Sequence, residues 1–133
     1  MIHSVLHDFA TRYTAAWCSH DADAVASFFA EDGSLTVNNG DPAVGRVAIA
    51  EVARGFFEAF PDTVVINDAV RGAGEHAVYL WTYVGTNTGP DGTGNAVRFS
   101  GWEAWRFNTD GLVQQSLGNF DAEEYEHQLA HGA

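Results

Sequence analysis

The chain has 133 residues, of which 46% are hydrophobic and 13% aromatic, enough apolar material for one packed core. Six arginines and no lysine stand against 18 acidic residues, which gives a formal net charge of -12. That sign is wrong for nucleic acid or an anionic membrane surface, and no apolar run approaches the ~20 residues of a membrane span, so we expect neither partner.

The cysteine content and the first residues bear on location. Cys18 is the only cysteine, which excludes an internal disulfide and agrees with a reducing compartment. Residues 1–9 lack the basic start and the long apolar stretch of a signal peptide. We therefore predict a cytoplasmic protein.

The first half of the chain is predicted to be mostly helical. Apolar residues recur at steps of three and four from Val5 onward, which indicates a helix with a buried stripe of Leu6, Phe9, Tyr13, Ala16 and Trp17. A short second helix is expected over residues 23–29, followed by a brief strand over 34–38. A third helix stops at Pro61 and has an apolar side made of Ile49, Val52, Phe56 and Phe60.

Beyond Pro61 the hydrophobic pattern changes to a period of two. Strands are predicted near residues 63–71, 76–86, 96–108 and 112–119, and the short turns between them favour a meandering antiparallel sheet. The acidic segment 122–131 is expected to form a short helix with Asp121 as its N-cap. Helices followed by a sheet indicate the α+β class, with one domain over residues 1–133.

Several short motifs accompany this order of elements: Arg12-Tyr13, Phe29-Ala30-Glu31-Asp32, Gly45-Arg46, the run at 85–90, Trp105-Arg106-Phe107 and Asn119-Phe120-Asp121. Together they resemble the SnoaL-like and ketosteroid-isomerase-like branch of the nuclear transport factor 2-like superfamily. The resemblance covers nearly the whole chain and implies a single SnoaL-like domain. Its expected fold is a cystatin-like curved antiparallel sheet packed on three N-terminal helices, with a cone-shaped pocket between them.

The resemblance also implies which residues face the pocket. The expected lining residues are Trp17, Leu35, Val37, Leu80, Thr82, Val84, Phe99, Trp105, Ser116, Gly118 and Phe120. The opposite sheet face would then carry Tyr79, Trp81, Tyr83, Trp102 and Arg106. Because aromatic residues and arginine are common at interfaces, this outer face is expected to form a homodimer.

The carboxylates used by characterised relatives are missing from this sequence. Val37 stands where ketosteroid isomerases have a base, and Gly118 stands where SnoaL-type cyclases and limonene epoxide hydrolases have an aspartate. Thr82 and Val84 replace the arginine and aspartate of those hydrolases, and Asn87 replaces a histidine frequent in SnoaL-like proteins. No complete catalytic set known from the family is present.

Glu103 and Tyr13 are the two positions that match. They coincide with the acid and the tyrosine that hold the substrate oxygen in ketosteroid isomerases, where an apolar site keeps a carboxylic acid neutral. Aromatic neighbours in its strand should desolvate Glu103, raise its pKa and suit it to proton transfer. The alternative is a structural carboxylate paired with an arginine or an indole N–H, and a Tyr13 that is a core ring.

The preferred functional hypothesis is a cofactor-independent isomerase, cyclase or hydratase. Its pocket would hold a small apolar or carbonyl-containing molecule, with Glu103 as the proton-transfer group and Tyr13 as an auxiliary hydrogen-bond donor. No metal is expected, because the pairs His3/His7 and His127/His131 lack a third ligand. The first alternative is a non-catalytic hydrophobic-ligand-binding or dimerisation module, and the second is a pocket collapsed by Trp105 and Phe120.

Overall fold

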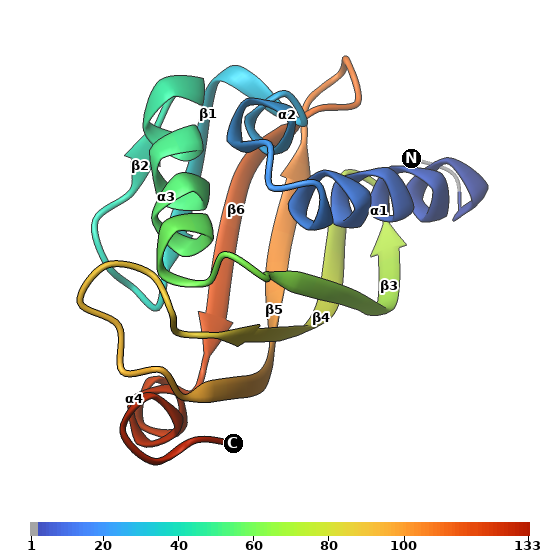
Figure 1. Ribbon diagram of the computed structural model, residues 1–133. Coiled ribbons are helices and arrows are strands. Elements are labelled where there is room, and N and C mark those ends of the chain that lie inside the picture. The colour runs from blue at the N-terminus through green and yellow to red at the C-terminus, as the bar shows by residue number, and fades with distance from the viewer. Residues whose placement is uncertain (1–2) are drawn as a thin grey trace.

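The computed structural model describes residues 3–133, which form four helices and six strands. In chain order these are α1 (His3–Cys18), α2 (Ala22–Ala26), β1 (Phe29–Val37), β2 (Ala43–Val44), α3 (Arg46–Ala59), β3 (Val64–Ala73), β4 (His76–Thr86), β5 (Ala96–Phe107), β6 (Val113–Phe120) and α4 (Ala122–His131) (Figure 1). None of the helices in this part of the chain is long and apolar enough to cross a membrane.

The strands form one curved sheet in the order β2-β1-β6-β5-β4-β3. The predicted antiparallel meander from β3 to β6 is confirmed, whereas β1 runs parallel to β6. This parallel pair joins two strands that are far apart in sequence, so local periodicity gave no sign of it. β1 is also longer than predicted and is irregular, because its register against β6 shifts between Phe29 and Ser34.

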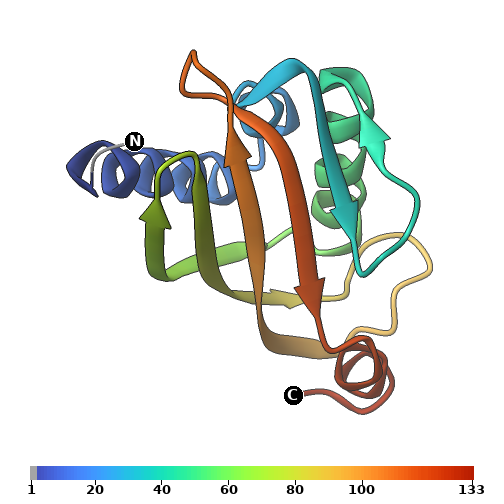
Figure 2. The same cartoon turned by 180° about the vertical axis from the view of Figure 1, so that it is seen from behind.

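Helices α1, α2 and α3 cover one face of the sheet and leave the other face without a helix over it (Figures 1 and 2). The predicted stripe of α1 is buried at Leu6, Phe9, Tyr13 and Ala16. Phe9 and Tyr13 pack edge-to-face on the ring of Trp105, with centroids 5.3 Å away in both cases. The expected α+β class, with three N-terminal helices packed on a curved sheet, is confirmed.

Helix α4 closes one end of the curved sheet. Asp121 caps it by accepting a hydrogen bond from the backbone of Glu124. Further along the helix, the buried amide of Gln128 accepts a hydrogen bond from the N–H of Arg98 (2.6 Å) and donates one to the carbonyl of Arg98 (2.9 Å). Because β6 pairs with β5 only from Gly101 onward, this side chain satisfies backbone groups that the sheet leaves unpaired.

The faces of β4 are the reverse of those predicted. Tyr79, Trp81 and Tyr83 lie opposite Glu103, Gly101 and Phe99 of β5 in the antiparallel register, and opposite residues share a sheet face. These three aromatic residues therefore point toward the helices, and the side chains of Val78 and Leu80 are exposed. Both faces of β4 carry apolar residues, so its own pattern does not distinguish them.

We predict that Gln128→Ala lowers the free energy of unfolding by about 2 kcal/mol, because it leaves two backbone groups of β5 without partners. Urea denaturation measures this change. The matched control is Gln115→Ala, which removes the same side chain at an exposed position of β6 and should have almost no effect. Equal stability of the two variants would contradict the assigned role of Gln128.

Candidate functional site

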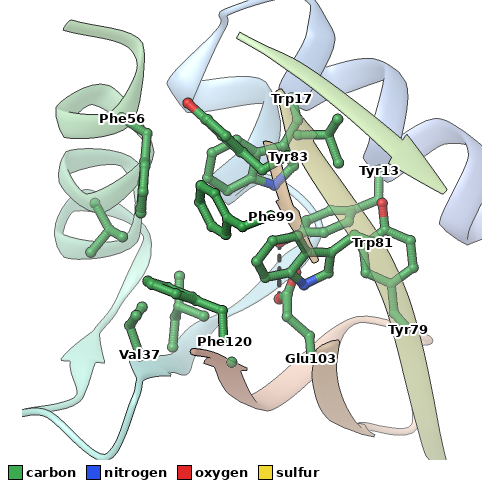
Figure 3. A pocket seen from close by; sticks show the side chains of 14 residues that line it. Tyr13, Trp17, Val37, Phe56, Tyr79, Trp81, Tyr83, Phe99, Glu103 and Phe120 are labelled. Atoms are coloured by element: carbon green, nitrogen blue, oxygen red, sulfur yellow. Dashed lines mark hydrogen bonds between the residues drawn. The ribbon is translucent and has the colours of Figure 1, made fainter. Parts of the chain in front are cut away.

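A pocket lies between the inner face of the sheet and helices α1 and α3 (Figure 3). Its cavity volume is about 70 Å³. It is lined by Tyr13, Trp17, Leu35, Val37, Val52, Phe56, Val65, Tyr79, Trp81, Tyr83, Phe99, Glu103, Gly118 and Phe120. Glu103 is the only ionisable acid in this set, and aromatic rings make up most of the wall.

The structure brings most of the predicted site residues to this pocket. Tyr13 and Glu103 line it together with the predicted residues Trp17, Leu35, Val37, Phe99, Gly118 and Phe120. Trp105 and Ser116 do not line it; both are fully buried and donate hydrogen bonds to the Glu103 carboxyl group. A cavity of about 70 Å³ remains, with Phe120 but not Trp105 in its wall, so the pocket is small and is narrowed by Phe120.

The prediction that Leu80, Thr82 and Val84 line the pocket is wrong, because all three lie on the outer face of β4. Leu80 is exposed there and pairs with Trp102 of β5. Thr82 is buried on that face by hydrogen bonds with Asp68 and Ser100. The β4 residues that do face the pocket are Tyr79, Trp81 and Tyr83, the same residues expected at the outer face.

Sequence reasoning also missed the lining residues Val52 and Phe56 of α3 and Val65 of β3. The first two belong to the predicted apolar side of the third helix, so the signal for a buried face was present. What the pattern lacked was any sign that this face borders a cavity. Pairing β4 with β5 through Glu103 would have identified Tyr79, Trp81 and Tyr83.

Three donors converge on one oxygen of the Glu103 carboxyl group. Oε1 accepts hydrogen bonds from the Ser116 hydroxyl at 2.7 Å, the Tyr13 hydroxyl at 3.1 Å and the indole N–H of Trp105 at 3.2 Å. The donors come from β6, α1 and β5, so they connect a helix to two strands. This network fixes the carboxyl group in one orientation.

The second oxygen of Glu103, Oε2, has no hydrogen-bond partner among residues 3–133 and borders the cavity. Within that range, the only fully buried side-chain oxygen or nitrogen without a partner is Oδ1 of Asn67. Glu103 is only 7% exposed and lines the pocket, so the accessible surface of Oε2 faces the cavity. A molecule in the pocket would therefore meet this oxygen.

Burial governs the acidity of the site. It raises the pKa of Glu103, and the hydrogen bonds from Ser116, Trp105 and Tyr13 oppose the rise without cancelling it. No ion pair among the described residues includes Glu103. Burial and the nearby carboxyl group also raise the pKa of Tyr13, so its hydroxyl stays protonated and acts as a donor.

The missing family carboxylates leave an apolar surface beside Glu103. Val37 and Gly118 are opposite each other in the β1–β6 pair, and both line the pocket. A Cβ atom on Gly118 would lie 3.8 Å from Cγ of Glu103, so a side chain there would touch the carboxyl-bearing chain. Asn87 has a structural role, since its side-chain amide donates a hydrogen bond to the carbonyl oxygen of Ala59 and accepts one from the backbone N–H of Thr93.

No cluster of three or more metal-ligating side chains occurs within residues 3–133. The rings of His3 and His7 lie 4.2 Å apart, and those of His127 and His131 lie 4.7 Å apart, both at the molecular periphery and away from the pocket lining. The described site therefore offers one carboxyl group, indole and phenol donors, and ring faces.

Comparison with known proteins identifies the family. The sequence pattern of the SnoaL-like domain matches residues 10–115, whereas no curated protein matches the chain. A protein from Jannaschia sp. CCS1 classed as a SnoaL-like polyketide cyclase superposes with a TM-score of 0.82 and 14% identity, covering 98% of this chain and 94% of that one.

Two further solved structures share the fold. A hypothetical protein with a ketosteroid isomerase-like fold from Catenulispora acidiphila, solved in complex with trimethylamine, has a TM-score of 0.78 and 18% identity over 88% of each chain. A nuclear transport factor 2-like protein of unknown function from Burkholderia pseudomallei has a TM-score of 0.80 and 18% identity, covering 94% of this chain and 97% of that one.

We predict that Glu103→Gln changes how stability depends on pH. A carboxyl group with a raised folded pKa contributes stability below its unfolded pKa, and this contribution is lost as the pH rises through the folded pKa. The variant cannot ionise, so its stability relative to the wild type should increase from about pH 4.5 toward neutral pH. Urea denaturation across this range measures the difference, and a constant difference would contradict the raised pKa.

Proposed function

Because the chain belongs to the family of SnoaL-like domains, we propose that it is a cofactor-independent enzyme of the isomerase, cyclase or hydratase type. Its substrate is a small apolar or carbonyl-containing molecule, and Glu103 transfers the proton. The observation that carries this proposal is the Glu103 carboxyl group, with Oε1 held by three donors and Oε2 bordering an aromatic cavity.

The two oxygens of Glu103 have different tasks in this proposal. Oε1 anchors the group, and Oε2 gives a proton to the substrate or takes one from it. A pKa raised by burial brings the acid and its conjugate base closer to equal population near neutral pH, where general acid–base catalysis is most effective. The apolar cavity excludes water that would otherwise solvate the carboxylate.

Tyr13 is a positioning residue in this account rather than a direct donor to the substrate. Its side chain is fully buried and its hydroxyl already donates to Glu103 Oε1. It therefore acts on the substrate only through the orientation and acidity of Glu103. This differs from the direct role that the resemblance implies.

The comparisons support a small-molecule role for this pocket. One structural neighbour is classed as a polyketide cyclase and another was solved with trimethylamine, a small amine. Both neighbours share the fold at less than 20% identity, so the trimethylamine of the second gives a size class for the proposal and not a substrate. The cavity volume of about 70 Å³ restricts the ligand to a small molecule.

A second candidate function is a non-catalytic module that binds a small hydrophobic molecule. The observation in its favour is the apolar surface left by Val37 and Gly118, where relatives carry catalytic carboxylates. In that case the Glu103 network serves to join α1 to the sheet. Binding of a ligand with no proton exchange would select this alternative.

We also propose that the outer sheet face joins two copies of the chain. No helix covers this face (Figure 2), and its exposed apolar side chains are Val64, Ile66, Val78, Leu80, Trp102 and Leu117. They lie on adjacent strands β3, β4, β5 and β6 around the polar residues Thr82 and Ser100, and exposed apolar residues gathered on one face are of the kind that marks an interface.

Leu80→Asp should convert the dimer to a monomer, because it places a charge at the centre of the apolar outer face. Sedimentation velocity of the wild type and variant measures the change. Val47→Asp is the control, since Val47 is also exposed but lies on α3, away from the sheet. A monomeric wild type, or an unchanged Leu80→Asp dimer, would contradict this interface.

Proton transfer is tested by deuterium exchange next to the carbonyl group of cyclohexanone in D₂O, followed by proton NMR. The wild type should accelerate the exchange, and Glu103→Gln should slow it by about 10²-fold or more, which is typical for loss of a general acid–base group. The control is Glu75→Gln, an exposed acid in the β3–β4 turn.

Equal exchange rates for the wild type and Glu103→Gln would contradict the proposed role of Glu103. Binding of cyclohexanone to the wild type without accelerated exchange would instead select the binding module. Binding is measured separately, by the change in tryptophan fluorescence on titration.

A further inference from the structure

The hydroxyl groups on the pocket wall are already engaged. Tyr13 donates to Glu103, Tyr79 shares a hydrogen bond with Thr14, and Tyr83 shares one of 2.6 Å with Thr63. None of these donors is available to a molecule in the cavity.

Two indole N–H groups on the wall, those of Trp17 and Trp81, have no hydrogen-bond partner among residues 3–133. Trp81 lines the pocket, and its Nε1 atom has no hydrogen-bond partner within that range. This nitrogen is not fully buried, so part of its surface is accessible. In Figure 3 the indole nitrogen is drawn on the side of the ring that is nearer to Glu103.

The position of the Trp81 ring depends on Gly101, its partner in the β4–β5 register. A Cβ atom on Gly101 would lie 2.6 Å from Cζ2 and 2.8 Å from Cη2 of the indole, closer than packing allows. The ring therefore lies across the glycine. Phe99 and Phe120 hold it edge-to-face, with centroids 5.9 Å and 6.2 Å away.

The register also places Trp81 and Glu103 on the same face of the sheet. Gly101 and Glu103 are two residues apart on one face of β5, a separation of about 7 Å along a strand. Because the indole lies over Gly101, the Trp81 side chain and the Glu103 carboxyl group come from neighbouring positions on the same wall of the pocket. Among the described lining residues, the only other polar side-chain group without a hydrogen-bond partner is the indole N–H of Trp17.

We propose that Trp81 is a substrate-binding residue whose indole N–H donates a hydrogen bond to the carbonyl oxygen of an uncharged substrate. This inference rests on the proposed function and names its substrate class, a small ketone, aldehyde or enone. No arginine or histidine belongs to the described lining, and the one ionisable acid is Glu103, so the pocket disfavours anionic substrates such as carboxylates and phosphates.

Trp81 and Glu103 together supply the hydrogen-bond donor and the base that an enolisation needs. Ionised Glu103 takes a proton from the carbon next to the carbonyl group through Oε2, the C–H electron pair forms a C=C bond, and the carbonyl electrons move to oxygen. The Trp81 N–H then bonds an oxygen that has gained negative charge, and such a donor acts more strongly on the transition state than on the ketone. Glu103 exchanges this proton with solvent and returns a proton, or in D₂O a deuteron, to carbon, which completes the cycle.

The test uses Trp81→Phe with cyclohexanone as the probe. Infrared difference spectra should show the carbonyl stretch of bound cyclohexanone at a lower frequency in the wild type than in Trp81→Phe. The variant keeps an aromatic ring at this position but has no N–H donor, so it should lose the shift. Deuterium exchange should slow by about 10²-fold, as for loss of one oxyanion donor. The control is Glu75→Gln, an exposed position in the β3–β4 turn, which should leave both the carbonyl shift and the exchange rate unchanged.

A second measurement needs no variant and guards against misfolding of Trp81→Phe. Cyclohexanone and methylenecyclohexane have nearly the same shape, but only the ketone accepts a hydrogen bond. The ratio of the two dissociation constants should favour the ketone by more than the ratio of the two water-to-octanol partition coefficients predicts. A carbonyl shift retained in Trp81→Phe, or no preference for the ketone, would overturn the proposal.

These outcomes are separate from those that test Glu103. Glu103→Gln should abolish exchange and keep the carbonyl shift, whereas Trp81→Phe should lose the shift. Exchange retained in Glu103→Gln together with a shift lost in Trp81→Phe would contradict the proposed function and leave the Trp81 contact in place. Exchange lost in Glu103→Gln together with a carbonyl shift retained in Trp81→Phe would contradict only the Trp81 contact.

Discussion

The burial of a single carboxyl group is the constraint on which this site depends. Taking a carboxylate out of water costs free energy unless hydrogen bonds replace its hydration, and three donors converge on Oε1 of Glu103. They come from α1, β5 and β6, so the same contacts that satisfy the carboxyl group also join the helix to the sheet. The fold thereby fixes Oε1 and leaves Oε2 at the cavity.

The rest of the pocket follows from how aromatic rings pack around that group. Trp105 stacks on Tyr79 with centroids 4.9 Å apart, and Tyr83 stacks on Phe99 at 5.3 Å. These two pairs join β4 to β5 on either side of Trp81, which lies over Gly101. Rigid rings therefore define the cavity wall, and the tyrosine hydroxyls bond outward to Thr14 and Thr63.

Sequence reasoning predicted the parts that depend on local pattern. The helical stripe through Tyr13, the α+β class and the family were predictable because periodicity and short motifs report them. Glu103 stood out as an acid between aromatic neighbours. The pocket face of β4 was not predictable, because both of its faces carry apolar residues and only the register against β5 decides between Leu80 and Trp81.

The most direct test of this account is the ionisation of Glu103 itself. Carbon NMR of protein labelled at the glutamate carboxyl carbon, titrated with pH and assigned by comparison with Glu103→Gln, follows that group alone. The account predicts that Glu103 titrates above the ordinary range of glutamate, because burial outweighs its three hydrogen bonds. A titration at or below that range would contradict it, since the group would then be a permanently ionised structural carboxylate.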